Sequence, residues 1–254
     1  MDLGGKAAIV TGGATGVGRA TALALARRGA GVVLNYSKSR DEAEETAREV
    51  RALGVPGLAV RADVASDADC RALVDTAVKE CGRLDVLVQS AGTTVFVPHG
   101  DLDGVKDEDW ERIFAVNVKG AFQCARAAKD AMLATGGGSI VNVSSTASLV
   151  AVGSSIPYCA SKAALNNLTI ALARVLAPKI RVNAVAPGFV TGRWLRQGHG
   201  DSYEKLKAAR EKKAVLGKVC EPEDVAAAIL SFVTGSELVT GQILVVDGGA
   251  LIAP

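Results

Sequence analysis

The sequence predicts an α/β fold in which helices cover both faces of an open, seven-stranded parallel sheet. Short apolar runs rich in β-branched residues recur along the 254 residues, as expected of strands that are buried on both faces. Stretches with a helical period separate these runs, and strands that alternate with helices form parallel βαβ units. No linker, repeat or low-complexity segment interrupts the pattern, which therefore predicts a single domain over residues 1–254.

Helical periodicity separates most of the apolar runs, so strands and helices alternate along the chain. The runs predict strands at residues 7–10, 32–34, 58–60, 86–88, 140–143, 182–185 and 243–246. The periodic stretches predict helices at residues 20–28, 41–53, 67–81, 109–133, 158–176 and 222–234. Residues 188–216 lack a clear period and begin at the carboxyl end of the sixth strand, where ligands bind in open α/β sheets. This segment is a candidate substrate lid.

Composition excludes several classes of protein. The net charge of +2, without a Lys/Arg block, argues against nucleic acid as a partner. No apolar run is long enough to span a membrane, and the first residues do not resemble a signal peptide. Five cysteines without a C-x-x-C pair and only two histidines predict neither disulfides nor a metal site. We therefore expect a cytoplasmic protein.

A glycine-rich turn follows the first strand. Gly12, Gly16 and Gly18 lie in the pattern G-x-x-x-G-x-G, directly before a helix, with Thr15 and Val17 between them. Backbone N–H groups at such a strand-to-helix turn point at an anion, and the glycines allow the chain to approach a pyrophosphate. The loop therefore predicts a dinucleotide site, although the spacing by itself is also that of a flexible loop.

The end of the second strand indicates which dinucleotide binds. NAD-selective proteins place an acid about 20 residues after the glycine loop to hold the ribose 2′-OH. Here no acid occurs before Asp41, and Ser37, Lys38 and Arg40 supply hydroxyl groups and cations instead. This pattern predicts a preference for NADP(H), with NAD(H) as the alternative. In the other interpretation, Lys38 and Arg40 merely flank a solvated helix start.

Tyr158 and Lys162 form the candidate catalytic pair. Residues four apart share a helix face, and a nearby ammonium group favours the phenolate form of a tyrosine. A second pair with this spacing, Tyr203 and Lys207, lies in the aperiodic segment and is interpreted as part of an exposed lid helix. Tyr158 is preferred because it follows a predicted strand that ends in hydroxyl groups, at Ser144 and Ser145.

Taken in order, several motifs resemble those of the short-chain dehydrogenase/reductase family across nearly the whole chain. They are the loop from Thr11 to Gly18, Asp63 and Val64 after the third strand, Ala91 and Gly92 after the fourth, Asn117, Ser145 at 13 residues before Tyr158, the segment of Pro187, Gly188, Val190 and Thr191, and residues 246–249. The resemblance implies a Rossmann-like, doubly wound fold. It also implies that the dinucleotide is contacted by the glycine loop (Gly12, Thr15, Gly16, Val17 and Gly18), Asp63, Val64, Ala91, Gly92, Pro187, Gly188, Val190 and Thr191. Tyr158 and Lys162 are expected to serve both cofactor and substrate.

The resemblance further implies a mechanism. Ser145 and Tyr158 hydrogen-bond the carbonyl oxygen of the substrate, and Tyr158 donates a proton while NADPH delivers a hydride. Lys162 binds the nicotinamide ribose and lowers the pKa of Tyr158, and Asn117 supports a water chain. Family members are commonly homotetramers that pair through the helices of residues 109–133 and 158–176.

Within the family, the chain most resembles 3-oxoacyl-[acyl-carrier-protein] reductases, which implies a 3-oxoacyl thioester on acyl carrier protein or CoA as substrate. Residues 134–138 lack the cation that such enzymes use to dock the carrier protein. The lid carries Phe189, Trp194, Leu195 and Tyr203, which also suit a hydrophobic or cyclic substrate. The alternatives are therefore an NAD-dependent alcohol, diol or sugar dehydrogenase, or a non-catalytic NADP-binding regulatory protein.

Four further residues lie near these motifs. Gln89 and Ser90 replace the Asn-Asn pair of the family before Ala91, which alters how the fourth strand is tied to its neighbour. His99 is interpreted as a surface loop residue and Cys159 as a packing residue.

Overall fold

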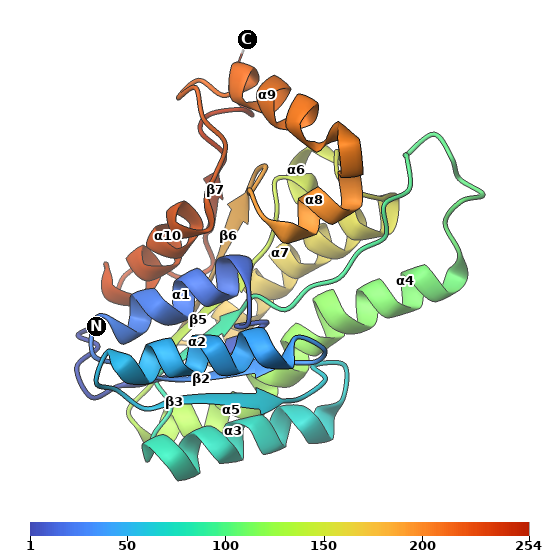
Figure 1. The fold of residues 1–254 in the computed structure, drawn as a ribbon. Coiled ribbons are helices and arrows are strands. Elements are labelled where there is room, and N and C mark those ends of the chain that lie inside the picture. The colour runs from blue at the N-terminus through green and yellow to red at the C-terminus, as the bar shows by residue number, and fades with distance from the viewer. Residues whose placement is uncertain (254) are drawn as a thin grey trace.

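A seven-stranded parallel sheet forms the centre of the molecule, as the sequence predicts (Figure 1). The computed structural model describes residues 1–253. The strands are β1 (Ala7–Thr11), β2 (Gly31–Tyr36), β3 (Gly57–Arg61), β4 (Val86–Gln89), β5 (Gly138–Val143), β6 (Ile180–Pro187) and β7 (Ile243–Val246). Their order is β3-β2-β1-β4-β5-β6-β7. The order reverses between β1 and β4, which marks the point where ligands bind in such sheets.

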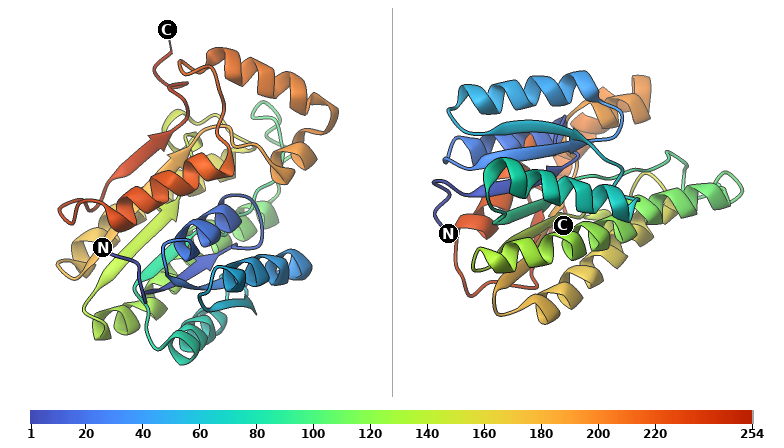
Figure 2. Two further views of the ribbon diagram at one scale, coloured as in Figure 1. Left: turned by 60° about the vertical axis from the view of Figure 1, so that its left-hand side comes forward. Right: turned by 90° about the horizontal axis from the view of Figure 1, so that it is seen from below.

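Helices pack on both faces of the sheet (Figure 2). They are α1 (Gly16–Ala26), α2 (Arg40–Ala52), α3 (Asp67–Cys81), α4 (Asp107–Phe114), the π-helix η1 (Ala115–Gly120), α5 (Ala121–Ala134), α6 (Ala147–Val150), α7 (Ile156–Leu176), α8 (Arg193–His199), the 3₁₀-helix η2 (Gly200–Ser202), α9 (Tyr203–Lys213) and α10 (Pro222–Thr234). One hydrophobic cluster joins α1, α2 and α10 to the sheet, and a second joins α3, α5 and α7 to the other face.

The strands alternate between these two clusters. In β1, Ala8 and Val10 face α1 and α10, whereas Ile9 packs with residues of α3 and α5. Because both faces are covered, every position of β1 can be apolar, and the strand reads as a continuous apolar run. This packing fixes the carboxyl ends of the strands along one edge.

The predicted helix of residues 109–133 is interrupted. It consists of α4, the π-helical turn η1 and α5. Asn117 lies in this turn, and its amide bonds the backbone of Thr93 and the hydroxyl group of Ser161. π-Helical turns are frequent at functional sites. The wider turn places Asn117 where these three bonds can form.

The candidate lid is also more ordered than the sequence indicates. Residues 188–216 contain α8, η2 and α9, which lie beyond the carboxyl end of β6 (Figure 1). Tyr203 and Lys207 do lie on a helix of the lid, α9, but the expected exposure is wrong for Tyr203, which is only 2% exposed. The ring packs on Phe189 and under the guanidinium of Arg196, at 4.4 Å from that group to the ring centroid.

Within residues 1–253, no helix combines the length and apolar character that crossing a bilayer requires. The same residues bring no three His, Cys, Asp or Glu side chains together in a way that could hold a metal ion.

Candidate active site

The glycine loop joins β1 to α1 and is held by the neighbouring strand. Gly12 has a φ of +62°, and a Cβ there would lie 3.0 Å from the Ala91 backbone. The Gly12 N–H donates to the side chain of Asn35 at 3.0 Å, and the Gly13 N–H donates to the Asn35 carbonyl at 3.1 Å. The Asn35 amide in turn donates to the Ala62 carbonyl at 2.6 Å. A single side chain in β2 therefore ties the loop to the end of β3.

The start of α1 fits a pyrophosphate. Thr15 precedes the helix but its side chain forms no capping bond, so the first N–H groups are available to a ligand. A Cβ built at Gly16 would meet no described atom within 4 Å, so this face of the loop is open. Gly18 is different, because a Cβ there would lie 2.2 Å from the Gly12 carbonyl oxygen. Gly16 thus leaves room for a ligand and Gly18 lets the helix approach the loop.

Gly18→Ala should open this loop. The added methyl group cannot avoid the Gly12 backbone, so we expect the free energy of unfolding to fall by about 2 kcal/mol and dinucleotide affinity to fall at least about tenfold. Gly100→Ala is the matched control, because a Cβ there would meet no described atom within 4 Å. Urea unfolding and NADPH titration by fluorescence measure the two effects. Unchanged NADPH affinity in a folded Gly18→Ala protein would contradict the assignment of the loop.

Two predicted cofactor segments flank this loop. Ser37, Lys38 and Arg40 lie exposed where β2 ends and α2 begins. Asp63 is exposed and Val64 is buried just after β3, where the Val64 carbonyl accepts from Gln123 at 2.9 Å. The structure brings both segments to the carboxyl edge beside Asn35.

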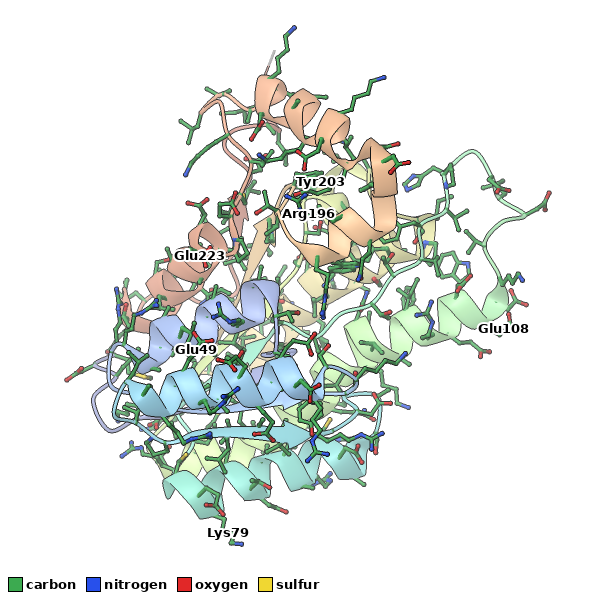
Figure 3. The ribbon with its side chains drawn as sticks, viewed as in Figure 1. Glu49, Lys79, Glu108, Arg196, Tyr203 and Glu223 are labelled. Carbon is green, nitrogen blue, oxygen red and sulfur yellow. The ribbon has the colours of Figure 1, made fainter. Side chains whose placement is uncertain are left out.

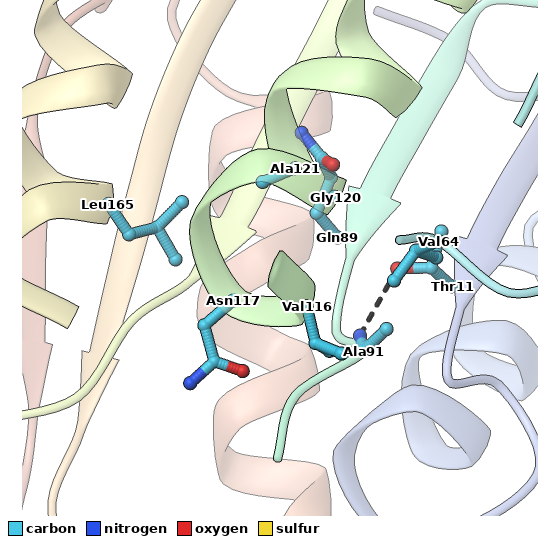
Figure 4. Close-up of a pocket in the computed structure, with 9 residues that line it drawn as sticks. All are labelled: Thr11, Val64, Gln89, Ala91, Val116, Asn117, Gly120, Ala121 and Leu165. Atoms are coloured by element: carbon cyan, nitrogen blue, oxygen red, sulfur yellow. Dashed lines mark hydrogen bonds between the residues drawn. The ribbon is translucent and has the colours of Figure 1, made fainter. Parts of the chain in front are cut away.

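A small cavity lies behind the fourth strand (Figure 4). It is lined by Thr11, Val64, Gln89, Ala91, Val116, Asn117, Gly120, Ala121 and Leu165. The Ala91 N–H donates to the Thr11 hydroxyl at 3.1 Å, which joins the ends of β4 and β1. Ala91 and Gly92 therefore lie beside the glycine loop, as the motif implies.

Gln89 ties the fourth strand to its neighbour β5, the kind of role that its place in the sequence predicts. Its amide donates to Asn142 at 3.0 Å, and Asn142 donates to Thr169 at 2.8 Å. All three side chains are buried, so the chain of bonds links β4 through β5 to α7 beneath the site. The signal in the sequence was a polar residue at or near the carboxyl end of each of two neighbouring strands, Gln89 in β4 and Asn142 in β5.

Four predicted catalytic residues come from three elements. Ser145 follows β5, Tyr158 and Lys162 lie on α7, and Asn117 lies on η1. The Ser155 hydroxyl caps α7 by accepting from the Tyr158 N–H at 3.4 Å, which fixes the turn that carries the phenol. The ammonium group of Lys162 lies 5.7 Å from the centroid of the Tyr158 ring and donates to the Val143 carbonyl at 2.8 Å.

Burial decides the protonation of this pair. Removal from water raises the pKa of Tyr158 to about 12, and the neighbouring Ser145 hydroxyl only partly opposes this rise. Burial lowers the pKa of Lys162 to about 8. The expectation that Lys162 lowers the pKa of Tyr158 is therefore not met in the free chain, because desolvation of the phenolate is the larger effect. At pH 7 the phenol carries a proton and the ammonium is still charged.

The lowered pKa of Lys162 gives a pH prediction. Below about pH 8 the side chain is protonated, and above it the charge is lost. For varied NADPH, kcat/KM reports the free enzyme, so it should be flat up to about pH 8 and then fall. Steady-state rates from pH 6 to 10 in buffers of constant ionic strength measure it. A flat profile through pH 10 would show that the charge on Lys162 does not matter.

The segment after β6 is tied to the far edge of the sheet. The Pro187 carbonyl accepts from the Thr146 N–H at 2.9 Å, and the Gly188 N–H donates to Val246 at 2.8 Å. Val190 pairs with Cys220, and Thr191 bonds Glu221 at the start of α10. These bonds hold the predicted segment 187–191 at the carboxyl end of β6, close to Ser145.

The lid packs over Tyr158. The rings of Trp194 and Tyr158 meet edge to face with centroids 6.1 Å apart. His199 meets Phe96 in the same way at 5.2 Å. Arg196 and Tyr203 lie on the inner side of the lid helices (Figure 3). The lid therefore supplies an aromatic wall, with Trp194 47% exposed toward solvent.

His99 and Cys159 lie near the site without entering it. The His99 Nε2 is 3.9 Å from the Cys159 Sγ, and Cys159 is buried. Burial raises the pKa of the Cys159 thiol, so it stays protonated and packs as the sequence analysis expects.

Comparison with known proteins places the chain among NAD(P)-dependent oxidoreductases. A family model described as enoyl-(acyl carrier protein) reductase matches residues 12–250. The chain is 42% identical over 243 residues to a Streptomyces violaceoruber protein named as ketoacyl reductase 2 of the granaticin polyketide synthase, covering 96% of this chain and 95% of that protein. It is 35% identical over 246 residues to the 3-oxoacyl-[acyl-carrier-protein] reductase FabG of Staphylococcus aureus, covering 96% and 97% of the two chains.

A solved structure agrees with these relatives. The structure described as NAD+-bound xylitol dehydrogenase has a TM-score of 0.89 with 28% sequence identity, and the match covers 98% of this chain and 100% of that one. The similarities extend over nearly the full length and include both reductases and a dehydrogenase. The chain is therefore an enzyme that belongs to the short-chain dehydrogenase/reductase family.

Proposed function

We propose that the protein is an NADP(H)-dependent reductase that converts a 3-oxoacyl thioester into its 3-hydroxy form. The observation that carries this proposal is the joint placement of Ser145, Tyr158 and Lys162 at the strand ends beside the open glycine loop. Similarity to a 3-oxoacyl-[acyl-carrier-protein] reductase supports the substrate class. The exposed cations Lys38 and Arg40 support the choice of NADP(H).

Each side chain has a separate task in this reaction. The bound dinucleotide supplies the hydride. The hydroxyl groups of Ser145 and Tyr158 donate to the substrate carbonyl oxygen and stabilise the negative charge that develops on it. Tyr158 then gives up its proton, which the raised pKa keeps on the phenol at pH 7. Lys162 holds the nicotinamide ribose, and Asn117, bonded to Thr93 and Ser161, supports the water chain that returns the proton.

Turnover of an acetoacetyl thioester tests the proposal. The purified protein is assayed with NADPH and with NADH at equal concentrations, using the CoA and carrier-protein thioesters in parallel. We expect at least about tenfold higher kcat/KM with NADPH, because the 2′-phosphate meets two cations. Faster oxidation of NADH would overturn the cofactor assignment. Absence of thioester turnover, with NADPH still bound, would overturn the substrate class.

An NAD-dependent alcohol, diol or sugar dehydrogenase is the second candidate. It is favoured by the similarity to the NAD+-bound xylitol dehydrogenase and by the absence of a cation at residues 134–138. In the structure these residues form a tight turn in which the Thr135 hydroxyl donates to the Leu84 carbonyl at 2.9 Å. Oxidation of secondary alcohols and polyols with NAD+, at rates above thioester reduction, would favour this candidate.

We also propose a homotetramer in the cytoplasm. An apolar groove runs between the helices predicted to form a subunit contact, α4 to α5 and α7. It is lined by Glu111, Phe114, Ala115, Val118, Lys119, Phe122 and Leu168. A second copy of the chain would bury this groove, and five free cysteine thiols suit a reducing compartment. Light scattering after size-exclusion chromatography should give four times the 26.0 kDa chain mass, and a monomer would contradict the assembly.

A further inference from the structure

The first residue of α8 reaches across the cofactor site to α2. The Arg193 guanidinium donates to the Glu42 carboxylate and to the Ser39 hydroxyl, the latter at 3.3 Å. Arg193 lies more than 150 residues from both partners in sequence. These two bonds tie the candidate lid, residues 188–216, to the rim of the cofactor site.

The anchor point is the position expected for a ribose 2′-phosphate. Ser39 lies between Lys38 and Arg40 and precedes α2, yet its side chain makes no capping bond to that helix. Its hydroxyl instead accepts from Arg193. Among residues 1–253, neither Lys38 nor Arg40 has a carboxylate partner within 4.0 Å. Ser39 thus contacts Arg193 and is flanked in the chain by the exposed Lys38 and Arg40, and Glu42 pairs with Arg193 alone among these cations.

We propose that Arg193 exchanges Glu42 for the 2′-phosphate of NADP(H), so that this phosphate holds the lid over the active site. The inference rests on the proposed preference for NADP(H). A guanidinium binds a phosphate through two parallel bonds, and a phosphate near neutral pH carries more charge than a carboxylate. An exposed Arg–Glu pair is weak by comparison, so the exchange favours the phosphate. Arg193 is a positioning residue, because it acts on the lid and not on the reacting atoms.

The bonds of Arg193 also affect the position of the next residue, Trp194. Trp194 follows directly in α8, and its ring meets the ring of Tyr158 edge to face at 6.1 Å. A contact that holds Arg193 in place therefore also holds the ring of Trp194 beside Tyr158, the proposed proton donor. Arg196, one turn further on, bonds Glu204 at 2.8 Å and covers the Tyr203 ring, so it is occupied within the lid. The two arginines share a helix but have different partners.

Binding of two nucleotides that differ only in the 2′-phosphate tests the proposal. Adenosine 2′,5′-bisphosphate and 5′-AMP are titrated by calorimetry into the full chain. Arg193→Ala is expected to weaken binding of the bisphosphate about tenfold and to leave 5′-AMP unchanged. Glu42→Gln should tighten the bisphosphate several-fold, because it removes the competing carboxylate. Arg196→Ala is the matched control and should change neither affinity.

A second readout follows the lid itself. In a Trp110→Phe background, Trp194 is the single tryptophan, and its emission should shift when the bisphosphate binds. Arg193→Ala should abolish that shift, while Arg196→Ala should keep it. The proposal is overturned if Arg193→Ala weakens both nucleotides equally, weakens neither, or keeps the shift. Should the unmodified chain bind the bisphosphate no better than 5′-AMP, the NADP(H) preference itself fails, which is a distinct result.

Discussion

Tyr158→Phe is expected to lower kcat for ketone reduction by about 10³-fold, the loss typical of a general acid. The substitution removes only the hydroxyl group and keeps the ring that meets Trp194. Because burial raises the pKa of Tyr158 to about 12, the phenol is protonated at pH 7 and its proton is available to the developing alkoxide. Affinity for NADPH, measured by fluorescence titration, should change by less than about threefold, since the hydroxyl group is not its main contact.

The chain provides a matched control for this substitution. Tyr203 stands in the same spacing to a lysine as Tyr158, and its hydroxyl is buried without a partner among the described residues. Tyr203→Phe should therefore keep kcat, and should leave stability equal or slightly higher, because it removes an unsatisfied polar group. If Tyr158→Phe also keeps the kcat of the unmodified enzyme, the chain is better explained as a non-catalytic NADP-binding regulatory protein.

Lys162→Met is expected to abolish activity and stabilise the fold at the same time. Burial lowers the pKa of Lys162 to about 8, and this shift of about two pKa units corresponds to a destabilisation of about 3 kcal/mol when the side chain is charged. Methionine fills a similar volume without a charge, but it leaves the Val143 carbonyl without its donor, which costs about 1 kcal/mol. The net gain at pH 7 is therefore about 2 kcal/mol, while the reaction loses the cation beside Tyr158.

The pH dependence of stability separates this explanation from better packing alone. Between about pH 8 and the pKa of an unfolded lysine, near 10.4, the unfolded chain binds more protons than the folded one at residue 162. The contribution of Lys162 to stability thus rises with pH in this window, and Lys162→Met should remove that rise. Urea unfolding at pH 7 and pH 9 measures both effects. Lys207→Met, at a partly exposed position of α9 where the ammonium pairs with Glu211, is the control. A Lys162→Met protein less stable at both pH values would contradict the account.

The sheet and the helix that carries Tyr158 and Lys162 were predictable because their signals are local. A strand buried on both faces is mostly apolar, so the run of four apolar residues from Ala7 to Val10 predicts β1 directly. Tyr158 and Lys162 lie one helical turn apart, and a helix brings such residues to one face whatever surrounds it. The glycine loop is likewise set by the conformations that Gly12 and Gly16 allow.

Other parts of the site depend on partners that lie far away in sequence. Asn35 looks like an ordinary interruption of β2 until the fold brings the Gly12 N–H to its side chain. Likewise, the role of Gln89 becomes clear only when the fold brings its amide within hydrogen-bond distance of Asn142. Tyr203 is buried because Phe189 and Arg196 pack against its ring, and no periodicity in α9 predicts these contacts.

The sequence by itself determined the fold class, the seven strands, the glycine-rich turn after β1 and the placement of Tyr158 and Lys162 on one helix. Tertiary structure decided the π-helical turn at Asn117, the protonation of the catalytic pair and the link from Arg193 to Glu42. Hydrophobic period and glycine conformation act within a few residues, so the sequence displays them directly. Desolvation and long-range hydrogen bonds depend on which surfaces meet, and only the folded chain brings those surfaces together.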